Sequence, residues 1–118
     1  MKSRIPLPLL FSSLLFIVSP AVSLAKDIVV GTSVALTGKY ARTGQEQLQG
    51  FQMWVEEVNA RGGLLGQKAK LVHYDDESKP ETGAKLYEKL ITVDQVDLLV
   101  GLHSSDVTMV VSTVAEKY

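Results

Sequence analysis

Residues 28–63, IVVGTSVALTGKYARTGQEQLQGFQMWVEEVNARGG, contain a short apolar segment followed by a long amphipathic one. Ile28–Gly31 is apolar and largely β-branched, which is typical of a strand covered on both faces in a parallel sheet. From about Gly44 to Arg61, apolar side chains recur at helical spacing and share one face. Thr43 and Glu46 have the S/T-x-x-E spacing of a capping box, which predicts that the helix begins there.

The same alternation of strand and helix occurs twice more. The pattern predicts a strand over Lys70–Tyr74, a helix over Pro80–Thr92 and a strand over Val96–Gly101. From Ser105 to Tyr118 the spacing is again helical, although its many valines lower the helix propensity. The order βαβαβα predicts an α/β fold: a three-layer, doubly wound parallel sheet with right-handed connections and helices on both faces.

The end of this pattern has no stop signal. The last predicted helix reaches Tyr118 without a cap, and no strand follows it. The strand over Val96–Gly101 would then form an uncovered apolar edge, which is an aggregation hazard. We therefore expect residues 26–118 to be part of a truncated, larger domain.

The first 25 residues predict a signal peptide. Lys2 and Arg4 precede the apolar run Ile5–Val18, and the small residues of Ser23–Ala25 follow. The run is shorter than the roughly 20 apolar residues that a spanning helix needs, so an uncleaved anchor is the weaker alternative. Cleavage after Ala25 predicts an exported chain that begins at Lys26 and is not inserted in the membrane.

Composition narrows the class of protein. The 118 residues include 12 basic and 13 acidic side chains, a net charge of −1, so nothing favours binding to nucleic acid or to an anionic membrane surface. The absence of cysteine excludes a disulfide scaffold, a thiol nucleophile and a lipidated N-terminal cysteine. A hydrophobic fraction of 46% with 21% charged residues is ordinary for a globular protein.

Glycines after the first strand do not match a nucleotide site. Six residues separate Gly31 from Gly38, where a P-loop has four, and Tyr40 stands where Ser or Thr would bind magnesium. No G-x-G-x-x-G follows the strand either. The sequence therefore predicts turn glycines and no cofactor.

Other candidate sites have plain structural alternatives. Asp75, Asp76 and Glu77 could bind a cation or a ribose hydroxyl, but without EF-hand spacing a solvated loop before a helix is favoured. His73 and His103 lack a partner at metal-ligand spacing. Neither G-x-S-x-G nor S-x-x-K is present, so no metal site and no catalytic residue is predicted.

Ser104, Ser105 and Asp106 are the candidate ligand-binding residues for which a physical mechanism of binding can be given. They lie between a predicted parallel strand and the helix that follows it. Open parallel sheets bind ligands beyond the carboxyl ends of their strands, and free amides at a helix N-terminus attract a carboxylate. One of the three residues could instead be a helix cap, and the two roles are compatible.

Four stretches, in the same order, resemble the type I periplasmic binding proteins, and most of all their leucine/isoleucine/valine-binding group. The stretches are VNARGGLLG at Val58–Gly66, Leu36–Gly38, Tyr74–Asp76 with Pro80 and Glu81, and Val100 and Gly101 followed by Ser104 and Ser105. The resemblance covers essentially all of Lys26–Tyr118.

The resemblance implies a function as well as a fold. Such proteins are two-lobed periplasmic receptors that deliver a small molecule to the membrane permease of an ABC importer. Residues 26–118 would be part of the N-terminal lobe, and the ligand would be a branched-chain or other amino acid, or an amide-like molecule. The role of holding the ligand's α-carboxylate would fall on Ser105, with Ser104 as a second candidate. Tyr40, Arg42 and Thr43 are the candidates for a side chain over the ligand.

The chain departs from the family at Leu102 and His103, where the family often has proline and an aromatic residue. Two other functions fit the same pattern. One is the sensory domain of a signalling receptor, and the other is a secreted α/β enzyme with its catalytic groups beyond Tyr118.

Overall fold

The computed structural model describes residues 26–118, so the predicted signal peptide lies outside the described residues. In chain order the elements are β1 (Ile28–Val34), α1 (Ala41–Ala60), β2 (Ala69–Asp75), α2 (Pro80–Thr92), β3 (Leu98–Leu99) and α3 (Ser105–Ala115). The predicted order βαβαβα is confirmed. None of the helices in residues 26–118 has the length and apolar character to cross a membrane.

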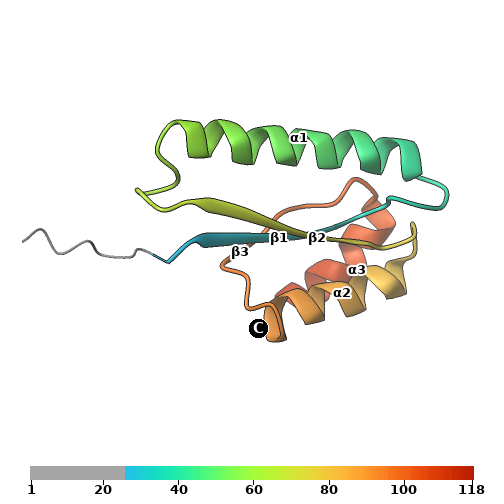
Figure 1. Cartoon of the computed structure of the whole chain (residues 1–118). Helices are drawn as coiled ribbons and strands as arrows, with labels where there is room; N and C mark the ends of the chain where they lie inside the picture. The colour runs from blue at the N-terminus through green and yellow to red at the C-terminus, as the bar shows by residue number, and fades with distance from the viewer. Residues whose placement is uncertain (1–25) are drawn as a thin grey trace, which may run out of the picture.

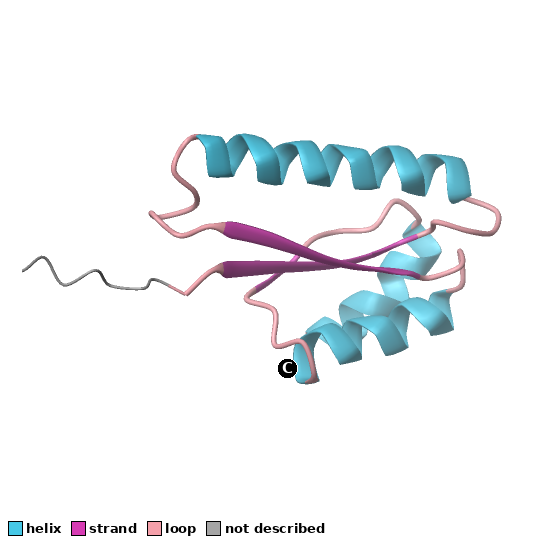
Figure 2. Ribbon diagram, in the orientation of Figure 1, coloured by secondary structure: helices cyan, strands magenta, loops and turns pink. Residues whose placement is uncertain are grey.

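The strands form one parallel sheet in the order β2-β1-β3. β1 pairs with β2 along its whole length, from Ile28 opposite Ala69 to Val34 opposite Asp75. α1 covers one face of the sheet, and α2 and α3 cover the other (Figures 1 and 2). The three layers confirm the predicted doubly wound α/β fold. The pairing also makes the loops after β1 and β2 neighbours.

β1 is longer than its apolar run predicts. It continues from Gly31 through Thr32 and Ser33 to Val34, although both polar residues are completely buried. Their hydroxyls are satisfied: Thr32 Oγ1 donates to Ser33 O at 3.0 Å, and Ser33 Oγ donates to Asp76 Oδ2 at 3.1 Å. A buried polar group is tolerated when it is hydrogen-bonded, so the strand passes through them.

The predicted start of α1 is wrong. The helix begins at Ala41, and Tyr40 occupies the N-cap position without a side-chain capping bond, so Thr43 and Glu46 do not form a capping box. The physical reason lies in another loop: the backbone N–H of Tyr40 donates to Ser78 Oγ at 3.0 Å. A side chain distant in the sequence thus holds the chain at the point where the helix starts.

β3 is shorter than predicted, with only Leu98 and Leu99 in the ladder. The Val100 carbonyl accepts hydrogen bonds from Tyr87 Oη at 2.6 Å and from Thr32 Oγ1 at 3.3 Å. These bonds fix the carbonyl by side chains rather than by a neighbouring strand. α3 starts at Ser105 as predicted but ends at Ala115, before the final residue.

The main core lies between the sheet and the helices α2 and α3. Its buried residues are Tyr87, Leu90, Val107 and Val111. Gly83 of α2 allows close approach, because a Cβ there would lie 2.8 Å from Val107 Cγ1. The missing side chain therefore sets the spacing between α2 and α3.

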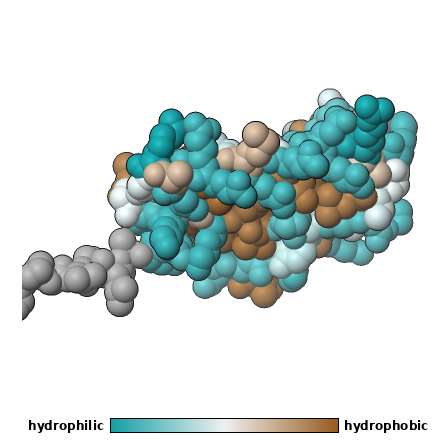
Figure 3. Space-filling model, turned by 45° about the horizontal axis from the view of Figure 1, so that its top comes forward, coloured by the Kyte–Doolittle hydropathy of each residue, from teal (hydrophilic) through white to brown (hydrophobic). Residues whose placement is uncertain are grey.

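The face beneath α1 is packed less completely. An open hollow of about 530 Å³, here called the apolar hollow, lies between α1 and the sheet. Its apolar lining includes Val30, Phe51, Trp54, Leu71 and Val100. Apolar surface is visible in the middle of the view in Figure 3.

Candidate ligand-binding site

A second, much smaller hollow, here called the site hollow, opens at the carboxyl end of the sheet. The space inside it is about 10 Å³, room for one water-sized group. Its polar lining comes from all three junctions between a strand and the following helix, and from α1: Tyr40, Gln47, Asp76, Ser78, His103 and Ser104. The loops after the strands thus converge on one point.

The site hollow lies where the chain changes face. β1 leads into α1 on one face of the sheet, whereas its neighbour β3 leads into α3 on the other face (Figure 1). In open α/β sheets, ligands bind at this topological switch point. Tyr40 comes from the loop after β1, and Ser104 comes from the loop after β3. The fold therefore brings two of the predicted site residues together.

Ser104 has the property expected of a ligand-binding side chain. It occupies the N-cap position of α3, yet its side chain makes no capping bond. Its Oγ atom is buried and has no hydrogen-bond partner among the described residues. Its backbone is fixed, because its carbonyl accepts hydrogen bonds from Thr108 N at 2.9 Å and Thr108 Oγ1 at 2.7 Å. An unsatisfied buried hydroxyl is costly, so a ligand that bonded to it would relieve this cost.

The other predicted site residues lie nearby but outside the lining. Ser105 is the first residue of α3 and is exposed, and Thr43 lies half-buried in the first turn of α1. Arg42 is exposed and pairs with Glu46 at 3.2 Å. Of the two serines, the structure places Ser104 in the wall of the site hollow.

Tyr40 and His103 form an aromatic pair in the lining. Their ring centroids are 5.9 Å apart and their planes are at 73°, an edge-to-face arrangement. Lys39 Nζ lies 4.9 Å from the centroid of the Tyr40 ring. Sequence reasoning rejected His103 as a metal ligand but did not assign it to the site. Its position directly before Ser104 was the available signal.

Asp76 is a second lining residue that sequence reasoning missed. Only 3% of it is exposed, so the prediction of a solvated loop is wrong for this residue. Its carboxylate accepts hydrogen bonds from Ser33 Oγ at 3.1 Å and Ser78 N at 2.9 Å. Burial raises the pKa of Asp76, and these hydrogen bonds offset the effect only in part. The wall of the site hollow thus contains a buried acceptor as well as the Ser104 hydroxyl.

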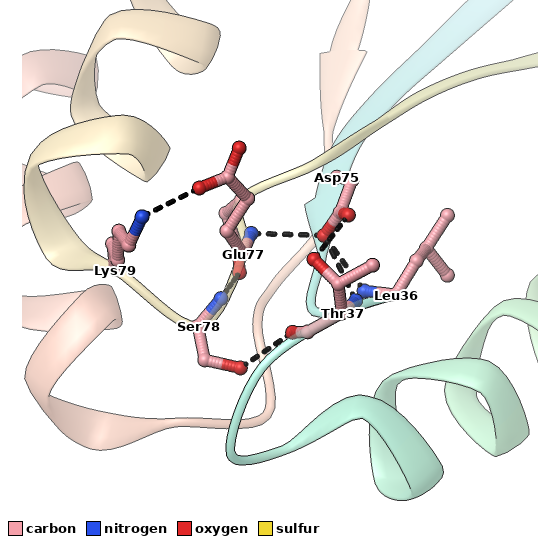
Figure 4. A network of polar contacts seen from close by, with 7 residues as sticks. Leu36, Thr37, Asp75, Glu77, Ser78 and Lys79 are labelled. Atoms are coloured by element: carbon pink, nitrogen blue, oxygen red, sulfur yellow. Dashed lines mark hydrogen bonds and ion pairs between the residues drawn. The ribbon is translucent and has the colours of Figure 1, made fainter.

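Asp75, at the end of β2, joins the loops after β1 and β2 (Figure 4). Its Oδ1 atom accepts hydrogen bonds from the amides of Leu36 at 2.9 Å, Thr37 at 3.2 Å and Glu77 at 2.8 Å. Its Oδ2 atom accepts a hydrogen bond from Thr37 Oγ1 at 2.7 Å. One carboxylate therefore fixes backbone on both sides of the gap between the loops.

The described residues show no metal-binding cluster. No group of three or more His, Asp or Glu side chains in residues 26–118 is arranged to hold a metal ion.

The profile of the periplasmic binding protein family matches residues 27–118. The chain belongs to the periplasmic binding protein family. The resemblance of its four sequence stretches is therefore confirmed.

Relatives with assigned names agree with this membership. This periplasmic binding protein chain is similar to Leu/Ile/Val-binding protein homolog 2 of Brucella abortus, with 34% identity over 88 residues, covering 75% of this chain and 24% of the relative. It is also similar to the Leu/Ile/Val-binding protein of Escherichia coli, with 31% identity over 94 residues. The match covers 80% of this chain and 25% of that protein. The chain thus spans about a quarter of the length of these relatives.

Solved structures give the same fold. The branched-chain amino acid transporter substrate-binding protein LivJ of Streptococcus pneumoniae, in complex with isoleucine, matches with a TM-score of 0.75 and 30% identity, covering 78% of this chain and 26% of that one. The chain also matches a solute-binding protein of an ABC transporter from Rhodopseudomonas palustris in complex with benzoate, with a TM-score of 0.69 and 30% identity. The match covers 78% of this chain and 25% of that one. Both ligands named in these complexes carry a carboxylate.

Proposed function

We propose that this chain is part of the N-terminal lobe of an extracytoplasmic solute-binding protein of an ABC importer. The whole protein would bind a branched-chain or other amino acid between two lobes and present it to a membrane permease. Family membership and the names of the relatives support this proposal. The observation that carries it is the Ser104 hydroxyl at the switch point of the sheet, which is buried and has no hydrogen-bond partner within residues 26–118.

In this proposal the ligand's α-carboxylate binds at the N-terminus of α3. It accepts a hydrogen bond from Ser104 Oγ and lies near the amides of Ser105 and Asp106, since first-turn amides have no backbone partner within the helix. The next amide, that of Val107, already donates to Asp106 Oδ1 at 3.0 Å. Tyr40 covers the ligand from the loop after β1. Ser105 and Thr43, which lie outside the site hollow, become contacts when the second lobe closes.

Export is proposed on the sequence pattern of residues 1–25, which is that of a signal peptide cleaved after Ala25. Mass spectrometry of the exported protein should find Lys26 at its N-terminus. An exported protein that keeps Met1 would contradict cleavage.

The ligand proposal is tested by calorimetry of the purified whole protein, with both lobes, against leucine, isoleucine, valine, a neutral amide and benzoate. Ser104→Ala should weaken amino-acid binding by roughly 10- to 150-fold, because a hydrogen bond to a charged group contributes about 1.5–3 kcal/mol. Ser112→Ala is the matched control and should leave affinity unchanged, since Ser112 is an exposed serine of α3 whose hydroxyl donates to Met109 O at 2.9 Å. No binding of any amino acid, or equal affinity in Ser104→Ala and wild type, would contradict the proposal.

A further inference from the structure

We propose that Asp75 and Ser78 are positioning residues for ligand binding. They hold the loop between β1 and α1 so that Tyr40 already lies in the wall of the site hollow before a ligand arrives. This inference rests on the proposed function, because it assigns a task to residues that support the same site.

Asp75 holds the start of the loop between β1 and α1. Asp75 accepts hydrogen bonds from two successive amides, those of Leu36 and Thr37, and from the Thr37 hydroxyl. These donors lie 38 or 39 positions away from Asp75 in the sequence. Hydrogen bonds to an ionised carboxylate are stronger than hydrogen bonds to a neutral acceptor. The entry into the loop is therefore fixed from the neighbouring strand.

Ser78 holds the end of the same loop. Ser78 Oγ donates to the Thr37 carbonyl at 2.9 Å and accepts a hydrogen bond from the Tyr40 amide at 3.0 Å (Figure 4 shows the first of these). Asp75 and Ser78 together, here called the loop bracket, thus bind both ends of residues 36–40. The N-cap residue of α1, Tyr40, makes no side-chain capping bond that could hold the end of the loop instead.

Backbone conformation supports a functional reason for the bracket. Glu77 and Ser78 both have positive φ, 54° and 61°, which is unusual for two successive residues other than glycine. Opposite them Gly38 has φ 83°, and a Cβ on it would lie 2.5 Å from the Glu77 carbonyl oxygen. Strained backbone in a tight contact persists where the surrounding bonds determine it, and such places are frequently ligand clamps.

Tyr40 connects the loop bracket to the site hollow. It is the last residue of the bracketed loop, and its ring packs against His103 from the loop after β3. A loop that had to be ordered on binding would cost affinity, whereas one already ordered would not. Asp75 is not in the lining of the site hollow, so it acts on the ligand through Tyr40.

Calorimetry with leucine and isoleucine tests this inference on the purified whole protein, with both lobes. The temperature is one at which thermal melts show that each variant is folded. Asp75→Ala should weaken binding by about tenfold, the equivalent of one immobilised side chain. In a Tyr40→Ala background the same substitution should have little further effect, because it acts through Tyr40. A structural defect elsewhere would not produce this coupling.

Asp97→Ala is the matched control. Asp97 accepts a backbone hydrogen bond from the Val29 amide at 2.8 Å, at the end of β1 opposite to the loop that Asp75 holds. It should leave affinity unchanged. If Asp75→Ala does not fold, Thr37→Val removes one hydroxyl of the same network and should weaken binding in the same direction. Wild-type affinity in Asp75→Ala, or in Thr37→Val where Asp75→Ala does not fold, would overturn the inference. So would an undiminished loss in the Tyr40→Ala background.

Amide hydrogen exchange separates this inference from the proposed function. The Tyr40 amide should exchange slowly in the wild-type protein and faster in Ser78→Ala, without any ligand. Equal exchange rates in the two proteins would overturn the positioning role. A wild-type protein that binds no amino acid would instead overturn the proposed function.

Discussion

Asp75 and Asp76 are adjacent, yet their surroundings shift their pKa values in opposite directions. For Asp75 burial acts to raise the pKa, but hydrogen bonds from the Thr37 hydroxyl and from three amides outweigh it, so the pKa lies below 3.8. For Asp76 burial dominates and the pKa lies above 3.8. The folded protein therefore favours the charged form of the first carboxyl and the neutral form of the second.

This difference predicts opposite pH dependences. Asp75 contributes stability above its unfolded pKa, and that contribution is lost as the pH falls through the lower folded pKa. Asp75→Asn should therefore be less stable than wild type at neutral pH, and the difference should shrink as the pH falls below 3.8. Urea unfolding over this pH range measures it.

The control for this experiment is Asp76→Asn. The contribution of Asp76 is fully present below its unfolded pKa and is lost as the pH rises through the raised folded pKa. This variant should therefore gain stability relative to wild type as the pH rises. A difference that stays constant with pH in both variants would contradict the assignment.

At the scale of the elements, one glycine determines how α1 packs on the end of β1. Gly44 is buried, and a Cβ on it would lie 2.0 Å from the Ala35 carbonyl oxygen, in backbone that cannot easily move. Gly50, in the same helix, has nothing within 4 Å of such a Cβ. The two positions therefore separate packing from helix propensity.

Gly44→Ala should lower the free energy of unfolding by about 1–3 kcal/mol or more, because it overpacks the contact. Gly50→Ala should raise it by about 0.5–1 kcal/mol, because alanine is the better helix former. Denaturant midpoints of both variants measure the contrast. If both substitutions stabilise the protein, α1 does not pack on β1 through Gly44.

Prediction from the sequence succeeded where the signals are local. The start of α2 was predicted to the residue and its end at about Thr92, because Pro80 marks the start and the apolar face continues to the end. The extent of β1 and β3 depends on Ser33 bonding to Asp76 and on Tyr87 bonding to Val100, pairs that are distant in the sequence. Periodicity does not contain such information.

For the candidate site too, local features could be predicted from the sequence, and features that depend on contacts between distant residues could not. The position of Ser104 between a strand and a helix is visible in the sequence, whereas the burial of its hydroxyl is not. Thr43 had the spacing of a cap, but Ser78 binds the amide at the start of α1 instead. A bond from one loop to another replaced the local one.

At the scale of the whole molecule, β3 is an edge with apolar surface on both sides. The apolar hollow reaches Val100 on the face of α1. On the other face, an open hollow of about 250 Å³ is lined by residues that include Leu98, Leu99 and Tyr118. In the part of the chain that the structure describes, β3 pairs with β1 alone.

This edge predicts that residues 26–118, made alone, associate with one another. Leu98, which is 52% exposed, is the position to test, and Leu98→Lys should reduce the larger species in sedimentation velocity while circular dichroism stays unchanged. Leu65→Lys is the control, since Leu65 is 95% exposed in the loop between α1 and β2. Equal effects of both lysines would show that the association does not depend on β3.

Trp54 is the single tryptophan of the sequence, and it lines the apolar hollow, not the site hollow. With 36% of the residue exposed, its indole is partly in contact with water. Its fluorescence is therefore sensitive to anything that covers the apolar hollow, and emission moves to shorter wavelength when water leaves. A ligand in the site hollow does not touch this ring. An emission change on adding an amino acid would thus signal movement around α1, at a distance from the ligand itself.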